Sequence, residues 1–230
     1  MPRFLSRFAT LTALAAAGCA PEGGPNGPWP VSADMPPLGM STEAWMHALA
    51  AHQRASLDGH TSSRLLAVID YSLPSTEPRI WVVDLDGGSV LYRDYVAHAA
   101  RSGGTWATAF SNRDGSNQSS LGTFVTANSY VGVRGKSLRL RGLEQGINDR
   151  ALARGIVIHG TPTVNAFRAA QGRLGRTNGC PAVSMESVRE LIGLIEDGVI
   201  LFSWYPDRSF LTRSGFVDPG AALLRLTSSD

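Results

Sequence analysis

The sequence contains two neighbouring stretches, Ile156-Val-Ile-His-Gly160 and Gly175-Arg-Thr-Asn-Gly-Cys-Pro-Ala-Val183, that indicate how its central part folds. The first is a run of β-branched residues that ends in a histidine and a glycine, which is typical of a strand and its end. The second is rich in glycine and polar residues and predicts a loop that carries Cys180. Because a strand end and a loop can converge, we expect His159 and Cys180 to lie side by side.

Cys180 is one of two cysteines in the chain, and the other, Cys19, lies in a stretch that resembles an export leader. In an exported protein, Cys180 would then have no partner in its own chain for a structural disulfide. A reactive thiol is the leading interpretation, and a buried, inert thiol is the alternative. A cysteine attacks a carbonyl efficiently near neutral pH when a neighbouring group takes its proton, and the imidazole of His159 suits that task.

The residues around this pair indicate how such a site would work. A main-chain carbonyl near Gly160 would fix the imidazole tautomer, and the missing side chain of Gly160 would leave room for a substrate. The amides of Asn178, Gly179 and Cys180 would form an oxyanion hole. A histidine at a strand end beside a glycine is also common as a structural feature, so spacing alone leaves both interpretations open.

The first 20 residues are typical of an export signal. Arg3 and Arg7 precede a short run of leucine, alanine and threonine, and Ala16-Ala-Gly-Cys19 resembles the cleavage box of bacterial lipoproteins. We expect Cys19 to become the lipidated first residue of the mature chain, and cleavage after Ala20 is the alternative. The apolar run is too short for a transmembrane helix. The expected location is the periplasm or cell envelope, with the lipid as the only membrane attachment.

Length and composition divide the chain into five parts: a signal peptide over 1–20, a Pro/Gly-rich tether over 21–40, an N-terminal helical segment over 41–62, a main domain over 63–215 and a tail over 216–230. The leader holds two of the 21 basic side chains, and removing these two leaves 19 against 19 acidic ones. This balance gives no indication of nucleic-acid binding. We expect a monomer.

The main domain has the pattern of a mainly β fold with a few helices (α+β). Strands are predicted over 65–71, 80–85, 90–97, 122–126, 137–140, 156–159 and 199–204. A packing helix is predicted over 42–55 with Thr42 as its N-cap. A second helix follows Cys180, with Ser184 as its cap and Gly198 at its end. The apolar stripe of this second helix consists of Val188, Leu191, Ile192 and Ile195.

No metal site and no cofactor are predicted. His47, His52 and His60 lie near the first helix but lack the spacing of metal ligands. His98, near the end of a strand, is interpreted as structural rather than catalytic. The polar stretch 112–120 would be either a surface loop or a wall of the groove.

The two stretches quoted first resemble the active-site strip of the murein L,D-transpeptidase catalytic domain family, a branch of the YkuD-like enzymes. Further motifs that resemble this branch follow in the same order: Ala67-Val-Ile-Asp-Tyr71, Val96-Ala-His98, Phe110-Ser-Asn112, Gln118-Ser-Ser-Leu-Gly122, Ser137-Leu-Arg-Leu140, Gly142-Leu143 and Asn148-Asp149. The likeness spans about Leu65 to Asp207, and such an ordered set of motifs is specific.

This resemblance implies a β-sandwich-like catalytic domain whose cysteine lies in a narrow groove and acts on peptidoglycan stem peptides. Cys180 would attack the diaminoacyl carbonyl of a stem tetrapeptide, release D-Ala and pass the acyl group to an amine acceptor. His159 would act first as base and then as acid. The Gly160 region would supply the carbonyl that orients the imidazole ring.

The resemblance also implies contacts with the substrate. Arg176 would bind a substrate carboxylate, for which its planar guanidinium is suited, and Thr177 would lie beside it. Thr177-Asn-Gly179 falls where the broader family has Ser-His-Gly. Pro181 and Ala182 replace the apolar residue and the arginine that follow the cysteine in the broader family. These departures leave the nucleophile and base in place but put the acceptor preference and the grip on the substrate in doubt.

Three other functions are weighed against transfer to an amine. Water could resolve the same acyl-enzyme, which would give an L,D-carboxypeptidase or amidase, and no sequence feature separates these outcomes. A catalytically silent wall-binding module is a second alternative, but it would have no need for a nucleophile paired with a base. A papain-like protease is disfavoured because Cys180 follows His159 in the chain.

Overall fold

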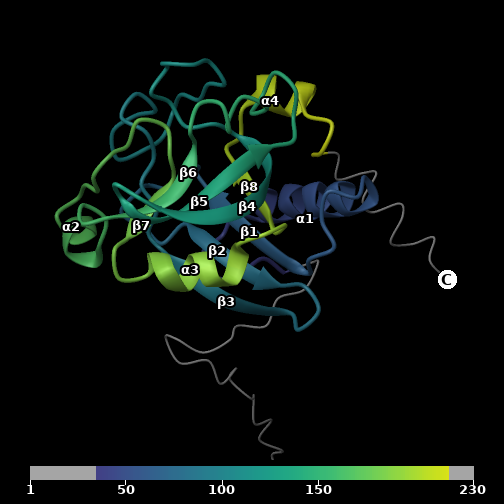
Figure 1. Cartoon of the computed structure of the whole chain (residues 1–230), viewed down its shortest axis with the longest axis horizontal. Coiled ribbons are helices and arrows are strands. Elements are labelled where there is room, and N and C mark those ends of the chain that lie inside the picture. The colour runs from purple at the N-terminus through teal and green to yellow at the C-terminus, as the bar shows by residue number, and fades with distance from the viewer. Residues whose placement is uncertain (1–34, 218–230) are drawn as a thin grey trace, which may run out of the picture.

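The computed structural model describes residues 35–217, in which eight strands form one mixed sheet accompanied by four helices (Figure 1). The strands are β1 (Leu65–Asp70), β2 (Ile80–Asp84), β3 (Ser89–Asp94), β4 (Gly122–Gly132), β5 (Gly135–Gly142), β6 (Val157–Thr161), β7 (Ala182–Ser184) and β8 (Ile200–Trp204). The helices are α1 (Thr42–Leu57), α2 (Ala166–Ala170), α3 (Val188–Ile195) and α4 (Arg208–Arg213). The predicted mainly β fold with a few helices is confirmed.

The order of the strands across the sheet is β3-β2-β1-β8-β4-β5-β6-β7. β8 lies in the middle, parallel to β1 and antiparallel to β4. At one edge, β6 pairs antiparallel with β5 and parallel with β7. β8, the last strand in the sequence, therefore joins β1–β3 to the strands β4–β7, which carry the expected site.

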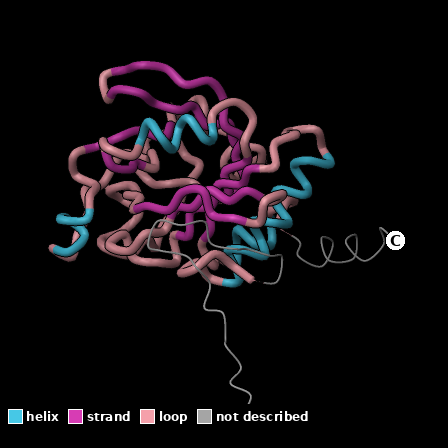
Figure 2. The backbone as a smooth tube through the Cα atoms, turned by 90° about the horizontal axis from the view of Figure 1, so that it is seen from below, coloured by secondary structure: helices cyan, strands magenta, loops and turns pink. Residues whose placement is uncertain are grey.

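α1 and α3 lie on opposite sides of the strands (Figures 1 and 2). α1 packs against β1 and β8, whereas α3 packs against β2, β5 and β6. The buried residues of α1 include five alanines, whose small side chains allow close approach to the sheet, and the large ring of Trp45. The predicted apolar stripe of α3 is buried as expected, with Val188, Leu191, Ile192 and Ile195 all in the core.

Two expectations about element ends are wrong. Ser41, not Thr42, is the N-cap of α1: the Ser41 hydroxyl accepts the Ala44 amide at 3.2 Å, and Thr42 is already helical. The strand expected to end at Thr126 continues to Gly132 because it forms a hairpin with β5. Polar residues on exposed hairpin arms lack the apolar alternation that marks a half-buried strand.

The expected cap and end of α3 also differ. Ser184 belongs to β7, and Ser187 is the N-cap residue, although the Ser184 hydroxyl accepts the Ser187 amide at 3.0 Å. The helix ends at Ile195, before Gly198. Asp197 and Gly198 follow with positive φ angles of 60° and 97°, which turn the chain towards β8.

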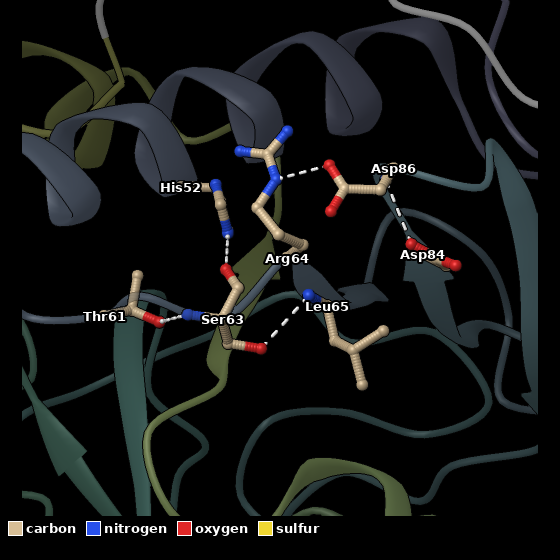
Figure 3. A network of polar contacts seen from close by, with 7 residues as sticks. All are labelled: His52, Thr61, Ser63, Arg64, Leu65, Asp84 and Asp86. Atoms are coloured by element: carbon tan, nitrogen blue, oxygen red, sulfur yellow. Dashed lines mark hydrogen bonds and ion pairs between the residues drawn. The ribbon is translucent and has the colours of Figure 1, made fainter.

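A network of polar contacts fixes the connection between α1 and β1 (Figure 3). His52 Nε2 lies 2.9 Å from the Ser63 carbonyl, and the Ser63 amide donates to the Thr61 hydroxyl at 3.0 Å. Arg64 then pairs with Asp86 in the β2–β3 turn, with 2.8 Å between Nε and Oδ1. His52 is thus a buried packing residue that anchors the start of the sheet.

The expected signal peptide with Cys19, most of the tether and most of the tail lie outside the described residues. The last part of the tether, residues 35–40, lies against the domain, and Met40 is buried in its core. Within residues 35–217, no helix combines the length and apolar character needed to cross a membrane.

Candidate active site

The sheet register places the cysteine loop beside the histidine. In the parallel pairing of β6 with β7, His159 lies opposite Ala182 and Gly160 lies opposite Val183. Cys180 lies just before β7, and so its loop is held next to β6. His159 and Cys180 line the same cavity of about 400 Å³, so the structure brings the two together.

One face of three neighbouring strands forms the floor of this cavity. Tyr130 on β4 lies opposite Ser137 on β5, which in turn lies opposite His159 on β6. Directly opposed residues share a face of the sheet, so these side chains form one row. The next pair on the same face of the hairpin is Gly132 with Gly135, and a Cβ on Gly135 would meet nothing within 4 Å. A Cβ on Gly132 would lie 2.9 Å from the Tyr130 ring, so the ring leans over this glycine.

The His159 ring is buried and held by the main chain. Its Nδ1 lies 2.9 Å from the Gly160 carbonyl oxygen. A carbonyl only accepts hydrogen bonds, so Nδ1 carries the proton and Nε2 keeps its lone pair. Burial lowers the pKa of His159, the Gly160 carbonyl offsets part of this shift, and the charge of Arg134 adds to it. The ring is therefore a neutral base at pH 7.

Gly160 does not leave room for a substrate, contrary to the expectation from sequence. A Cβ at this position would lie 3.0 Å from the Met185 sulfur and 3.0 Å from Val188 Cγ1. Gly160 is thus small so that α3 and the turn before it can pack against β6. Its carbonyl, as described above, is the group that orients His159.

The Cys180 thiol is protonated at rest. Burial raises its pKa, while the amides of Val157 and Cys180 itself and the charges of Arg134 and Arg154 offset part of the rise. The thiol donates to the Gly155 carbonyl at 3.7 Å rather than to His159. At pH 7 the site therefore holds a neutral thiol and a neutral imidazole, and not a preformed ion pair.

Thr177 braces the loop in front of the cysteine. Its hydroxyl donates to the Cys180 carbonyl at 2.6 Å and accepts the Gly179 amide at 3.3 Å. Gly179 has a φ of 143°, and a Cβ there would lie 2.6 Å from Ile156 Cδ1, so only glycine fits. Of the three amides expected to form an oxyanion hole, that of Gly179 is thus already engaged, whereas Asn178 is exposed.

Arg176 is not brought to the cavity. Its Nη1 donates to the Gly103 carbonyl at 3.1 Å and reaches the Ala100 carbonyl at 3.5 Å. The Arg176 side chain therefore ties the cysteine loop to the segment around residue 100.

Two other arginines, Arg134 and Arg154, lie near the site, and no role was predicted for either of them from the sequence. Arg134 lies at the tip of the β4–β5 hairpin and lines the cavity. Arg154 donates to four acceptors in the 111–120 segment: the Ser111 carbonyl, the Ser116 and Ser120 hydroxyls and the Gln118 carbonyl, at 2.6–3.1 Å. Neither belongs to a motif, so only the folded chain reveals that their charges act on Cys180.

The polar stretch 112–120 packs behind the cysteine loop and does not line the 400 Å³ cavity. Asn112 Nδ2 donates to Asp149 at 2.7 Å. Asn148 donates to the Leu121 and Thr123 carbonyls at 2.9 and 3.0 Å. Asn112 and Asn148, two motif residues outside the active-site strip, thus brace the loops around the site.

A fully buried arginine supports the segment beside the cysteine loop. Arg79 donates through Nε and Nη2 to the Val96 carbonyl, at 3.1 and 2.9 Å, and through Nη1 to the Leu73 carbonyl at 2.7 Å. Its Nη2 also lies 2.8 Å from His98 Nδ1. The guanidinium can only donate, so His98 accepts at Nδ1 and is neutral.

The segment next to His98 pairs with both ends of the cysteine loop. The amide of Ala97 donates to the Ala182 carbonyl at 2.8 Å. The Thr177 amide donates to the His98 carbonyl at 3.2 Å, and the Ala100 amide donates to the Thr177 carbonyl at 2.7 Å. His98 is thus a residue of the scaffold, and its ring does not line the cavity.

Fold and site together define a mainly β domain with a cysteine and a histidine that share a cavity, an arrangement suited to acyl transfer. The family model for the L,D-transpeptidase catalytic domain matches residues 38–204, more than half of the chain, and the chain belongs to this family. The resemblance found in the sequence is thereby confirmed.

Solved structures with similarity to the chain include two L,D-transpeptidases. The protein from Mycobacterium smegmatis is 12% identical, with a TM-score of 0.38 over 62% of this chain and 59% of that chain. The protein from Xylanimonas cellulosilytica is 14% identical, with a TM-score of 0.39 over 72% of this chain and 81% of that chain. No curated protein matches the chain significantly.

Proposed function

We propose that the protein is a peptidoglycan L,D-transpeptidase in which Cys180 is the nucleophile and His159 the general base and acid. One observation carries the proposal: the Gly160 carbonyl fixes the proton of His159 on Nδ1, which leaves a basic Nε2 in the same cavity as the thiol. Cys180 is also the only cysteine among residues 35–217. Family membership supplies the substrate class, the stem peptides of peptidoglycan.

The first half of the reaction forms a thioester. Cys180 rotates from its contact with Gly155 and gives its proton to His159 Nε2 as the sulfur attacks the diaminoacyl carbonyl of a stem tetrapeptide. The S–C bond forms, and collapse of the tetrahedral intermediate breaks the C–N bond to the terminal D-Ala. His159 returns its proton to the leaving nitrogen, so D-Ala departs as the free amino acid.

The second half of the reaction transfers the acyl group. The amine of an acceptor stem peptide loses a proton to His159 and attacks the thioester carbonyl. A new amide C–N bond forms, the S–C bond breaks, and the proton returns to the Cys180 sulfur. Because thiol and imidazole are neutral at rest, both half-reactions depend on an imidazole that is unprotonated at pH 7, and the lowered pKa of His159 keeps it so.

The negative charge that develops on the substrate's carbonyl oxygen in the tetrahedral intermediate needs hydrogen-bond donors close to the Cys180 sulfur. The amides of Cys180 and Val157 both act on the sulfur and lower its pKa, so they lie where such donors are needed. The Cys180 and Asn178 amides remain our candidates for the oxyanion hole. Thr177 would contribute by holding the turn through the Cys180 carbonyl.

The test uses residues 21–230, which lack the expected signal peptide and are called the soluble domain below. This protein is incubated with a disaccharide tetrapeptide, with and without a second muropeptide that carries a free amine. A cross-linked dimer with one D-Ala released per cross-link supports transpeptidation. A tripeptide product alone identifies an L,D-carboxypeptidase with the same acyl-enzyme. Absence of D-Ala from a folded protein that still binds peptidoglycan would replace the proposal with a wall-binding module, and Cys180→Ala is the matched negative control.

We also propose that the protein is exported and held in the cell envelope by a lipid on Cys19, as the leader composition suggests. The full chain, produced in a bacterium fed with a labelled fatty acid, should carry the label and partition into detergent. Cys19→Ala should lose both properties. A wild-type protein that is released unlabelled after cleavage beyond Cys19 would overturn the lipid proposal.

A further inference from the structure

We propose that Arg134 binds the C-terminal carboxylate of the donor stem peptide, the carboxylate of the D-Ala that leaves. This inference rests on the proposed function and adds to it the residue that selects a donor with a free C-terminus. Arg134 lies in the two-residue turn of the β4–β5 hairpin, between the paired Gly132 and Gly135. From there it lines the cavity that also contains Cys180 and His159.

The hairpin holds Arg134 over the floor of the cavity. β4 pairs with β8 only from Gly122 to Val125, whereas its pairing with β5 continues to the hairpin turn. The hairpin therefore extends beyond the centre of the sheet (Figure 2). The Arg139 guanidinium lies 4.2 Å from the centroid of the Tyr130 ring, a cation–π contact that ties the two arms together.

Arg134 is the charged group of the cavity that has no partner of its own. Among the described residues lining the cavity it is the only charged one, and it makes no hydrogen bond or ion pair within residues 35–217. The neighbouring cations are engaged: Arg154 donates to the 111–120 segment and Arg176 to the Gly103 and Ala100 carbonyls. A planar guanidinium with free donors is well suited to a carboxylate.

The covalent structure of the donor peptide indicates that the anion bound by Arg134 is the C-terminal carboxylate. In a tetrapeptide donor, the amide nitrogen and one carbon separate the scissile carbonyl from the terminal carboxylate. This anion must therefore lie close to Cys180 and His159 when the carbonyl reaches the sulfur. The charge of Arg134 acts on both residues, so the guanidinium is close enough to the site to meet this anion. No acidic side chain lines the described part of the cavity to compete for it.

The experiment compares two tetrapeptide muropeptides, one with a free C-terminus and one with a C-terminal carboxamide, on four proteins: wild type, Arg134→Gln, Arg134→Lys and Arg141→Gln. Arg141 is an exposed arginine on β5 that does not line the cavity, so its substitution makes the same charge change on the same hairpin. The measurement is kcat/KM for release of D-Ala or its amide. Alkylation of Cys180 by iodoacetamide reports the intrinsic reactivity of the thiol in each variant.

We expect wild type and Arg141→Gln to prefer the acid by about 10-fold or more, as for a hydrogen bond to a charged group. Arg134→Gln should lose most of that preference by slowing the acid alone, and Arg134→Lys should restore part of it. Equal slowing of acid and amide in Arg134→Gln, or no preference in the wild type, would overturn the inference. If the wild type releases nothing from either peptide while Cys180 is alkylated normally, the proposed function itself has failed.

Discussion

His98 should make the stability of the protein fall steeply in mild acid. Burial, and then the charge of Arg79, lower the pKa of His98 to about 4 from its ordinary value of 6.5, and the nearby main chain of Gly103 and Gly104 offsets part of the shift. A histidine that is neutral in the fold takes up a proton more readily in the unfolded chain. Its contribution is therefore intact above pH 6.5 and is lost as the pH falls towards 4.

The size of the effect follows from the pKa difference. Each pKa unit corresponds to about 1.4 kcal/mol, so His98 alone should remove about 2 kcal/mol between pH 7 and pH 5 and about 3 kcal/mol by pH 4. The perturbation is His98→Asn, which can keep an acceptor for Arg79 but does not titrate. His98→Gln is a second variant with a longer side chain, because either substitution alone also changes the packing.

The assay is urea unfolding of the soluble domain at pH 7 and pH 5, followed by tryptophan fluorescence. Both variants should be less stable than the wild type at pH 7 yet lose about 2 kcal/mol less on acidification. The comparison is between the changes in the free energy of unfolding from pH 7 to pH 5. The loss of packing and the titration of the other histidines cancel in this comparison, because the first is the same at the two pH values and the second is the same in all three proteins. An equal loss of stability in the wild type and both variants would show that protonation of His98 does not cause the acid sensitivity.

Three further outcomes follow from the site. The rate of Cys180 alkylation should still rise through about pH 9, because burial raises its pKa, and a plateau near pH 7 would contradict this. Gly179→Ala should abolish D-Ala release and lower the thermal midpoint, since its Cβ would meet Ile156 at 2.6 Å; an active, equally stable variant would contradict the loop geometry. Arg154→Met should lower the free energy of unfolding, measured with urea, by about 2–4 kcal/mol, because four hydrogen bonds are lost. A change below about 0.5 kcal/mol would contradict the role of Arg154 as a brace of the 111–120 segment.

The sequence predicted the elements with strong local patterns. The apolar strands around Leu66, Val82 and Ile158 and the stripe of α3 all lie in the core, because burial of one face leaves a period in the sequence. The pair of His159 and Cys180 was also anticipated from a strand end and a loop. Both signals depend on residues that are close together in the chain.

The features that were missed depend on contacts between distant segments. β7 is only three residues long and exists because it pairs with β6. The missing side chain of Gly160 was expected to leave room for a substrate, whereas α3 packs against it, which no local pattern could reveal. Arg134 sits in an ordinary turn, and its importance appears only because Tyr130, Ser137 and His159 align across three strands.

The proposed reaction depends on an acyl-enzyme that Cys180 forms with a stem peptide, with His159 as the base. Intact-protein mass spectrometry of the soluble domain, incubated with a tetrapeptide muropeptide in the absence of an amine acceptor, tests it most directly. We expect a mass increase equal to the donor minus D-Ala, present on the wild type, absent from Cys180→Ala and strongly reduced in His159→Ala. A folded wild-type protein that gains no such mass and releases no D-Ala, or an adduct that persists in Cys180→Ala, would contradict it.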